Sequence, residues 1–212
     1  MVQTMMLPPP PVSVREVLRY GGVKTADDTM TALIEQCITE ALPQCQYKVC
    51  YSRLPVSVDG DAVTLGNVSV CSSKLSKTLR GCHEAVVFAA TVGIGIDRLI
   101  AKYQTISPSK AVVMQALGAE RIESLCDAFC RQLETPQSPR FSPGYGDLPL
   151  DFQRELFAIL DCPRKIGVSL TEGLLMSPSK SVTAIVGIGG ETCQQHGCAY
   201  CENTTCEFRR SV

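Results

Sequence analysis

Residues 47–70 constrain the fold of this chain most strongly, because they predict antiparallel pairing between strands that are close in sequence. Residues 56–58 and 62–65 are rich in strand-forming side chains and flank Asp59 and Gly60, a dipeptide typical of a tight hairpin turn. Residues 84–91 read EAVVFAAT, an apolar run that predicts a further, buried strand. Any fold for this chain must therefore build a sheet that contains a local hairpin.

Helical segments surround these strands in the sequence. Helix-start residues, prolines and apolar spacing predict helices or turns near residues 12–24, 25–42, 72–80, 95–103, 108–133 and 149–160. Two more strands are predicted at residues 166–171 and 181–188. Helices interleaved with antiparallel strands predict the α+β class, with a twisted antiparallel sheet and flanking helices.

Two of the predicted helices allow more specific predictions, one from the glycines at its start and one from its charged residues. The glycines Gly93 and Gly95 follow a strand and open a helix, but the third glycine of a dinucleotide-binding turn is missing. We interpret them as a turn that lets the helix pack tightly, which can still line a ligand pocket. On the helix that begins at Pro108, we expect Glu120, Arg121, Glu123 and Asp127 to form the solvated side.

Length and charge limit the classes of function. The 212 residues suit one large domain or one domain with a small appendage. A net charge of −1 and a pI near 6.1 argue against a nucleic-acid partner. We find no apolar run long enough to span a membrane and no signal peptide in residues 1–11, which we interpret as a flexible N-terminal lead. These features predict a cytoplasmic protein.

Residues 140–147, which read RFSPGYGD, combine one fixed cation, two aromatic rings, a proline and two glycines. Glycine allows close backbone approach and positive φ, whereas proline fixes φ and removes an N–H donor. Such a loop can clamp a small polar ligand and cover its flat parts with rings. The alternative is an ordinary loop between two helices, with Tyr145 as a packing residue.

The same loop begins a longer pattern. R-x-x-P-G-Y-x-x-x-P at residues 140–149 is followed by I-G-V-x-L-T-E-x-x-x-M-x-P-x-x-S-V at residues 166–182. This pattern resembles the activation domain of cobalamin-dependent methionine synthase. Upstream of it the chain resembles that family only in general layout. The resemblance implies an activation domain over residues 12–190, as a free-standing subunit without the large substrate and cobalamin domains.

The resemblance implies a methyltransferase component that binds S-adenosylmethionine. Its task would be the reductive methylation of cob(II)alamin presented by a partner cobalamin-binding methionine synthase subunit, with an electron from flavodoxin or a similar donor. Positioning of two bound partners would supply the catalysis, so no catalytic side chain is expected. The alternative is a non-enzymatic adaptor that docks a corrinoid protein.

For the ligand site, the resemblance implies that Arg140 pairs with the carboxylate of S-adenosylmethionine through two parallel hydrogen bonds. Glu134 could pair with the ligand ammonium group, or could be an ordinary surface glutamate. The expected ligand-binding residues are Arg140, Phe141, Pro143, Gly144, Tyr145 and Glu134. For Thr171, Glu172 and Ser181 the alternatives are support of the pocket and support of the hairpin.

Two departures from the family pattern affect the site. The acidic residue that the family carries near the start of the domain has no secure counterpart, and Asp27 and Asp28 are weak candidates. The tyrosine pair that follows the last strands is replaced by residues 189–192 and a group of cysteines. Both departures bear on affinity for the ligand.

The chain has twelve cysteines, eight of them scattered among apolar residues and interpreted as core residues. The other four lie in residues 191–212, a predicted metal- or cluster-binding tail with ligands Cys193, Cys198, Cys201 and Cys206. Their spacing suits zinc or an iron–sulfur cluster, with His196 as an alternative ligand. A redox-active Cys-x-x-Cys pair and unligated tail cysteines are the other interpretations.

Overall fold

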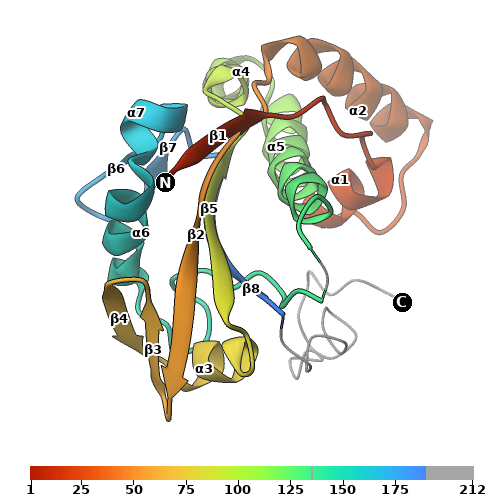
Figure 1. Cartoon of the computed structure of the whole chain (residues 1–212). Coiled ribbons are helices and arrows are strands. Elements are labelled where there is room, and N and C mark those ends of the chain that lie inside the picture. Colours follow the sequence, from red (N-terminus) through yellow and green to blue (C-terminus); the bar gives the residue numbers. More distant parts are fainter. Residues whose placement is uncertain (135, 190–212) are drawn as a thin grey trace.

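The fold was obtained as a computed structural model, which describes residues 1–134 and 136–189. Its centre is an antiparallel sheet in the order β4-β3-β2-β5-β8, with β1 paired to β2, and a separate hairpin joins β6 and β7 (Figure 1). The predicted α+β class is confirmed. The strands are β1 Gln3–Met6, β2 Lys48–Asp59, β3 Ala62–Leu65, β4 Val68–Cys71, β5 Glu84–Thr91, β6 Ser169–Leu170, β7 Met176–Ser177 and β8 Ser181–Ile188.

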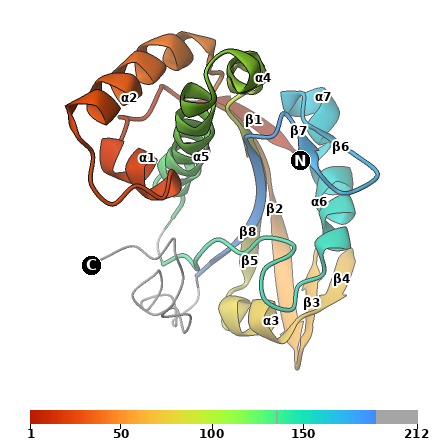
Figure 2. The same ribbon diagram turned by 180° about the vertical axis from the view of Figure 1, so that it is seen from behind.

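Helices cover both faces of the central sheet (Figures 1 and 2). One layer contains α1 Val14–Tyr20, α2 Asp28–Ala41, α4 Gly95–Ile106 and α5 Pro108–Cys130, with the short turn η1 Leu42–Gln44 between α2 and β2. The other contains α3 Ser73–Leu79, η2 Leu150–Phe152, α6 Gln153–Leu160 and α7 Cys162–Ile166.

The sequence of β5 explains the two layers. Val86 and Phe88 pack in the core under α5, whereas Ala85 and Val87 pack in the core under α6. Successive side chains of a strand point to opposite faces, so the uninterrupted apolar run from Ala85 to Ala90 needs cover on both sides. The hairpin at Asp59 is present as predicted, with Asp59 opposite Ala62.

The N-terminal residues differ from the expected flexible lead, because Gln3–Met6 form β1 and pair with β2. The prolines that follow are held by a buried charge. The Arg121 guanidinium donates to the carbonyls of Pro10 (2.6 Å) and Pro11 (2.8 Å). Proline has no N–H but keeps its carbonyl acceptor, which a buried arginine can satisfy.

The prediction that the charged residues of α5 form a solvated side is wrong at two positions. Glu120 and Arg121 are 1 % and 0 % exposed and form an ion pair inside the helical layer. Glu120 also accepts the Ser13 N–H at 3.1 Å, just before α1. The prediction failed because the partners of this pair come from a segment more than a hundred residues away in sequence.

The predicted strand at residues 166–171 is shorter than expected. Ile166 ends α7, Gly167 follows with φ of 73°, and only Ser169–Leu170 pair with β7. We expected Gly95 to let the helix pack tightly on the sheet; its close contact is with η1 instead, because a Cβ there would lie 2.2 Å from the Gln44 carbonyl oxygen.

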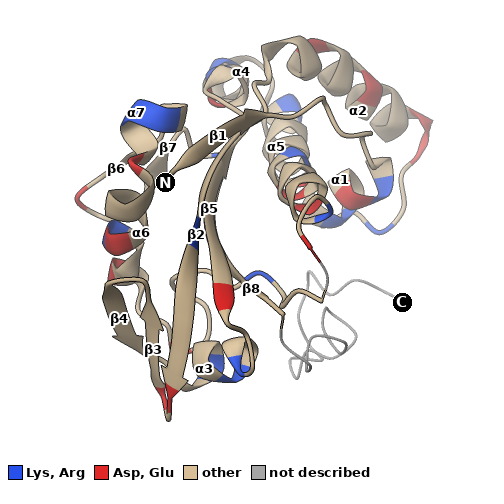
Figure 3. Ribbon diagram, viewed as in Figure 1, with Lys and Arg blue, Asp and Glu red and all other residues tan. Residues whose placement is uncertain are grey.

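Charged residues of both signs are interspersed over the helices and strand ends drawn in Figure 3. Within the described residues, no helix is long and apolar enough to cross a membrane. Most of the scattered cysteines are core residues as predicted, since Cys37, Cys50, Cys82, Cys126 and Cys162 are buried.

Candidate functional site

Residues 140–147, here termed the PGY loop, are anchored at both ends. Near the start, Phe141 and Ile185 on β8 exchange two backbone hydrogen bonds of 2.9 and 2.8 Å. At the end, the Asp147 carboxylate accepts the Ser73 N–H (2.8 Å) and hydroxyl (2.7 Å) at the N-terminus of α3. The loop therefore runs from the outer edge of β8 to the start of α3 (Figure 2).

The two glycines of the PGY loop set its path. Gly144 has φ of 87°, and its N–H donates to the Leu148 carbonyl at 2.9 Å. Gly146 has φ of 60°, and a Cβ there would lie 2.5 Å from Cδ of Lys74. Positive φ favours glycine at both positions, and the close approach to α3 adds a second reason at Gly146.

A cavity of about 320 Å³ lies where the PGY loop meets β7, β8, α5 and α6. Its lining joins the two halves of the sequence pattern, because Met176 and Val182 of the second half face the same space as the loop. The residues that line it are Glu123, Arg140, Ser142, Pro143, Tyr145, Gln153, Met176, Val182 and Thr183.

Arg140 forms the charged end of this cavity together with Glu123 of α5, and Asp127 of the same helix contacts Arg140 without lining the cavity. Arg140 Nη2 donates to Glu123 at 2.7 Å, and its buried Nη1 lies 2.9 Å from Asp127 Oδ1 without the angle of a hydrogen bond. Burial raises the pKa of the neighbouring Cys130 to about 11, so that thiol is neutral. Arg140, Glu123 and Asp127 together carry one net negative charge.

Thr183 lies on the part of β8 that faces the cavity. The residue is 2 % exposed, and its hydroxyl is buried with no hydrogen-bond partner in the described part of the chain. A buried polar group without a partner is rare in folded proteins and points to a ligand, an ion or a water.

Several predicted site residues lie elsewhere. Glu134 is 62 % exposed and pairs with Arg53, which also pairs with Glu84 at 2.8 Å, and it does not line the cavity. Phe141 packs in the core beneath α6. Asp27 caps α2 by accepting the Met30 N–H at 2.8 Å.

The polar residues near the β6–β7 hairpin support structure. The Ser181 hydroxyl lies 2.8 Å from both the Thr91 hydroxyl and the Pro178 carbonyl, and can donate its one hydrogen to either. The Thr171 hydroxyl accepts the Leu175 N–H at 3.0 Å. Glu172 is exposed, and it is its backbone carbonyl that accepts a bond from Arg154.

Six residues of the cavity wall were not predicted as site residues. Ser142, Met176 and Val182 lie within the sequence pattern, whereas Glu123, Gln153 and Thr183 lie outside it. Glu123 and Asp127 did carry a usable signal. They are four positions apart, so they share one face of α5 and can both meet a single cation. Nothing local in the sequence marks Thr183.

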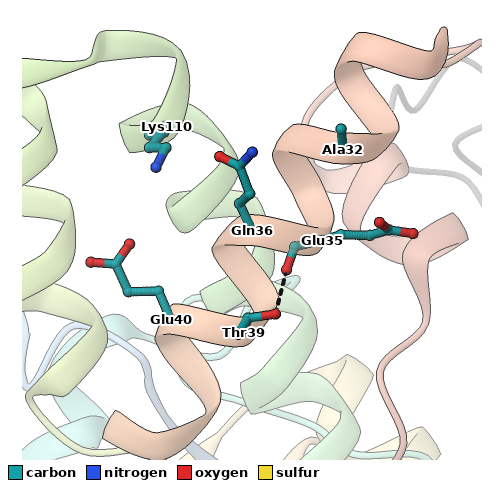
Figure 4. A pocket seen from close by; sticks show the side chains of 6 residues that line it. All are labelled: Ala32, Glu35, Gln36, Thr39, Glu40 and Lys110. Carbon is teal, nitrogen blue, oxygen red and sulfur yellow. Dashed lines mark hydrogen bonds between the residues drawn. The ribbon is translucent and has the colours of Figure 1, made fainter.

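Two further grooves are present among the described residues. One of about 980 Å³ lies between α1 and α5 and includes Glu123 and Asp127 in its wall. Another, of about 470 Å³, lies between α2 and the start of α5, where Figure 4 shows Gln36 and Glu40 directed toward the side of Lys110. Neither contains residues of the sequence pattern.

No group of three or more His, Cys, Asp or Glu side chains suited to a metal occurs in residues 1–134 and 136–189. The predicted ligands Cys193, Cys198, Cys201 and Cys206 lie outside the described residues.

Comparison with known proteins agrees with this geometry. The fold is that of a reactivation domain: a solved structure described as the MetH reactivation domain bound to AdoHcy aligns with a TM-score of 0.63 and 14 % identity, over 93 % of this chain and 80 % of that one. Residues 133–207 match the family model for the activation domain of vitamin B12-dependent methionine synthase. The predicted resemblance to that activation domain is thereby confirmed. No curated protein sequence matches significantly.

Proposed function

We propose that this chain binds S-adenosylmethionine in the cavity beside the PGY loop. In this role it would support reductive methylation of cob(II)alamin on a partner cobalamin-binding methionine synthase subunit, as a free-standing activation subunit. The observation that carries the proposal is the convergence of both halves of the sequence pattern on one cavity, between the Arg140 charge cluster and the unpartnered Thr183 hydroxyl. The family match over residues 133–207 supports it independently.

The charge of the cavity suits this ligand. S-adenosylmethionine carries a carboxylate, an ammonium and a sulfonium group, one net positive charge against the net negative charge of Arg140, Glu123 and Asp127. The ligand carboxylate would replace one acid on Arg140, and the released acid would face the ammonium group. These side chains are 24–38 % exposed, so solvent offsets part of the cost of breaking one internal pair, and the ligand groups replace the partner that is lost.

The bound ligand would supply a methyl group on sulfur that is open to attack by the cobalt of cob(I)alamin, formed from cob(II)alamin by one electron from a flavodoxin-like donor. The residues of this chain would bind and orient the ligand. Arg140 fixes the amino-acid end, and the anchored PGY loop keeps the site in shape. Such positioning makes two bound partners react as if they were parts of one molecule.

Calorimetric titration tests the proposal. Arg140→Ala should weaken binding of S-adenosylmethionine by about tenfold or more, because a charge-assisted pair is lost. Arg98→Ala, at an exposed position of α4 outside the cavity, should leave the affinity unchanged. An unmodified chain that fails to bind millimolar S-adenosylmethionine would contradict the proposal.

One set of observations favours the adaptor function. Arg140 already has two internal acidic partners, and Tyr145, Leu150 and Leu175 are apolar side chains that are 69 %, 46 % and 71 % exposed. An adaptor would dock a corrinoid protein through such a surface without a small ligand. In that case, association with the corrinoid partner would be the same with and without S-adenosylmethionine.

The other predicted sites remain proposals. We infer that Cys193, Cys198, Cys201 and Cys206 bind zinc or an iron–sulfur cluster, and that the chain acts in the cytoplasm. Metal analysis and a visible absorption spectrum of anaerobically purified protein test the first inference. A metal-free, colourless protein with full ligand binding would contradict it.

A further inference from the structure

The outer edge of β8 is only partly covered. Phe141 pairs with Ile185, and Gln137 pairs with Ile188, so residues 137–141, which end inside the PGY loop, act as a short neighbouring strand. Backbone groups of a strand point alternately to its two sides. The N–H and C=O of Ile185 point outward to Phe141, and those of Thr183, two residues earlier, point outward as well.

Pro143 explains why this pairing stops. In antiparallel register with Phe141 opposite Ile185, the residue opposite Thr183 is residue 143. Pro143 has no N–H and cannot continue the ladder. The loop leaves β8 at this point, and Ser142, Pro143, Val182 and Thr183 all line the cavity that opens there.

The cavity has two chemically different ends. Glu123 comes from α5, on one face of the sheet, and holds Arg140. Gln153 and Met176 come from the other face, where α6 and β7 lie. The side chain of Thr183 points to this second face, because it lies two residues from Ile185 in the core under α6. The second end is therefore neutral, with hydrogen-bonding groups and a thioether.

We infer that Thr183 is the residue that recognises the adenine ring of the nucleoside ligand. Its outward N–H donates to ring N1, its C=O accepts from the exocyclic amine, and its hydroxyl makes a further bond to the nucleoside. A strand edge presents a donor and an acceptor side by side, and the adenine edge presents the matching acceptor and donor. This inference rests on the proposed function and extends it to a selectivity-determining residue.

The chemistry of the base provides the test. Hypoxanthine carries a hydrogen on N1 and an oxygen on C6, so its donor and acceptor are exchanged relative to adenine. A site that pairs with adenine through two backbone groups leaves both groups unsatisfied against hypoxanthine. Sites built to hydrogen-bond a ligand reject an analogue that cannot pair with them.

The experiment is calorimetric titration of the full chain with S-adenosylhomocysteine and with S-inosylhomocysteine. The inference predicts that the adenosine compound binds at least about tenfold more tightly. Equal affinities would overturn the assignment of Thr183 and leave the proposed function standing. If neither compound binds, both the proposed function and this inference are overturned.

A variant isolates the side chain. Thr183→Val keeps the shape of the residue but removes the hydroxyl. It should weaken the binding of S-adenosylhomocysteine by about three- to tenfold. Thr64→Val is the matched control, because it removes a strand hydroxyl that bonds Ser69 outside the cavity and should have no effect. An unchanged affinity for Thr183→Val would overturn the bond assigned to the Thr183 hydroxyl, whereas the comparison of the two bases tests its backbone groups.

If Thr183→Val does not fold, hydrogen exchange in the unmodified chain supplies the second measurement. The Thr183 amide should exchange more slowly with S-adenosylhomocysteine than with an equal concentration of S-inosylhomocysteine. The same exchange rate with saturating S-adenosylhomocysteine as without ligand would overturn the inference.

Discussion

Single residues hold distant parts of this chain together. Arg121 is fully buried and joins the N-terminal prolines to α5, while Asp147 ties the PGY loop to α3. Both contacts connect segments more than seventy residues apart. Their strength therefore bears on whether the site keeps its shape.

Arg121→Ala should lower the free energy of unfolding by about 3–5 kcal/mol, because it leaves the Glu120 carboxylate buried without its partner. Denaturation in urea measures this change. The double change of Glu120→Leu and Arg121→Met removes both charges and should cost much less. Equal losses for the single and the double change would show that the ion pair is not responsible.

Asp147 predicts a dependence on pH. Hydrogen bonds from Ser72 and then Ser73 hold the pKa of its carboxyl well below the ordinary value. The folded state therefore favours the charged form, and its stabilising effect is present above the ordinary pKa of about 4 and is lost as the pH falls below that value. The protection of the Ser73 amide, which is its exchange rate relative to an unstructured amide at the same pH, should fall over this range, and Asp147→Asn should remove the dependence. Retention of the same acid dependence in Asp147→Asn would assign it to another group.

At the scale of elements, close packing is the main constraint. Gly95→Ala should destabilise the chain by about 1–3 kcal/mol, because its Cβ would meet the Gln44 carbonyl oxygen at 2.2 Å and α4 would have to move. Gly173→Ala, whose nearest neighbour would be 4.0 Å away, should be nearly neutral. Thermal unfolding of both variants measures the difference, and similar melting temperatures would contradict it.

Elements set by local sequence could be predicted, and those set by distant partners could not. The hairpin at Asp59, the buried β5 and the helix from Pro108 follow from turn residues and apolar spacing. β1 was missed, because its four residues carry no pattern apart from their pairing with β2. The burial of Glu120 was not predicted, because its carboxylate accepts a hydrogen bond from the Ser13 N–H, which lies more than a hundred residues away in sequence.

The candidate site divides in the same way. Arg140, Pro143 and Tyr145 were predicted from one compact pattern, and they do line a common cavity. Glu123 and Thr183 were not predicted as site residues, because they reach the PGY loop only through the packing of α5 and β8 in the folded chain. For Glu134 the resemblance implied a ligand contact and the alternative was a surface glutamate; in the structure it is exposed and pairs with Arg53, which agrees with the alternative.

At the scale of the whole molecule, the sheet and its two helical layers form a cavity beside the partly covered edge of β8. The layer with α5 brings acids, the layer with α6 brings neutral groups, and β8 runs between them (Figure 2). A partner that presents cobalamin would have to approach where the PGY loop exposes Tyr145. In the proposed function, ligand and partner would therefore meet on this side of the chain.

The central claim is that the cavity beside the PGY loop is the ligand site, and a crystal structure of the chain saturated with S-adenosylhomocysteine tests it most directly. The account predicts the ligand between the PGY loop and β8, with its carboxylate within hydrogen-bond distance of Arg140. A ligand seated instead in the groove between α1 and α5, without contact to the PGY loop, would contradict it.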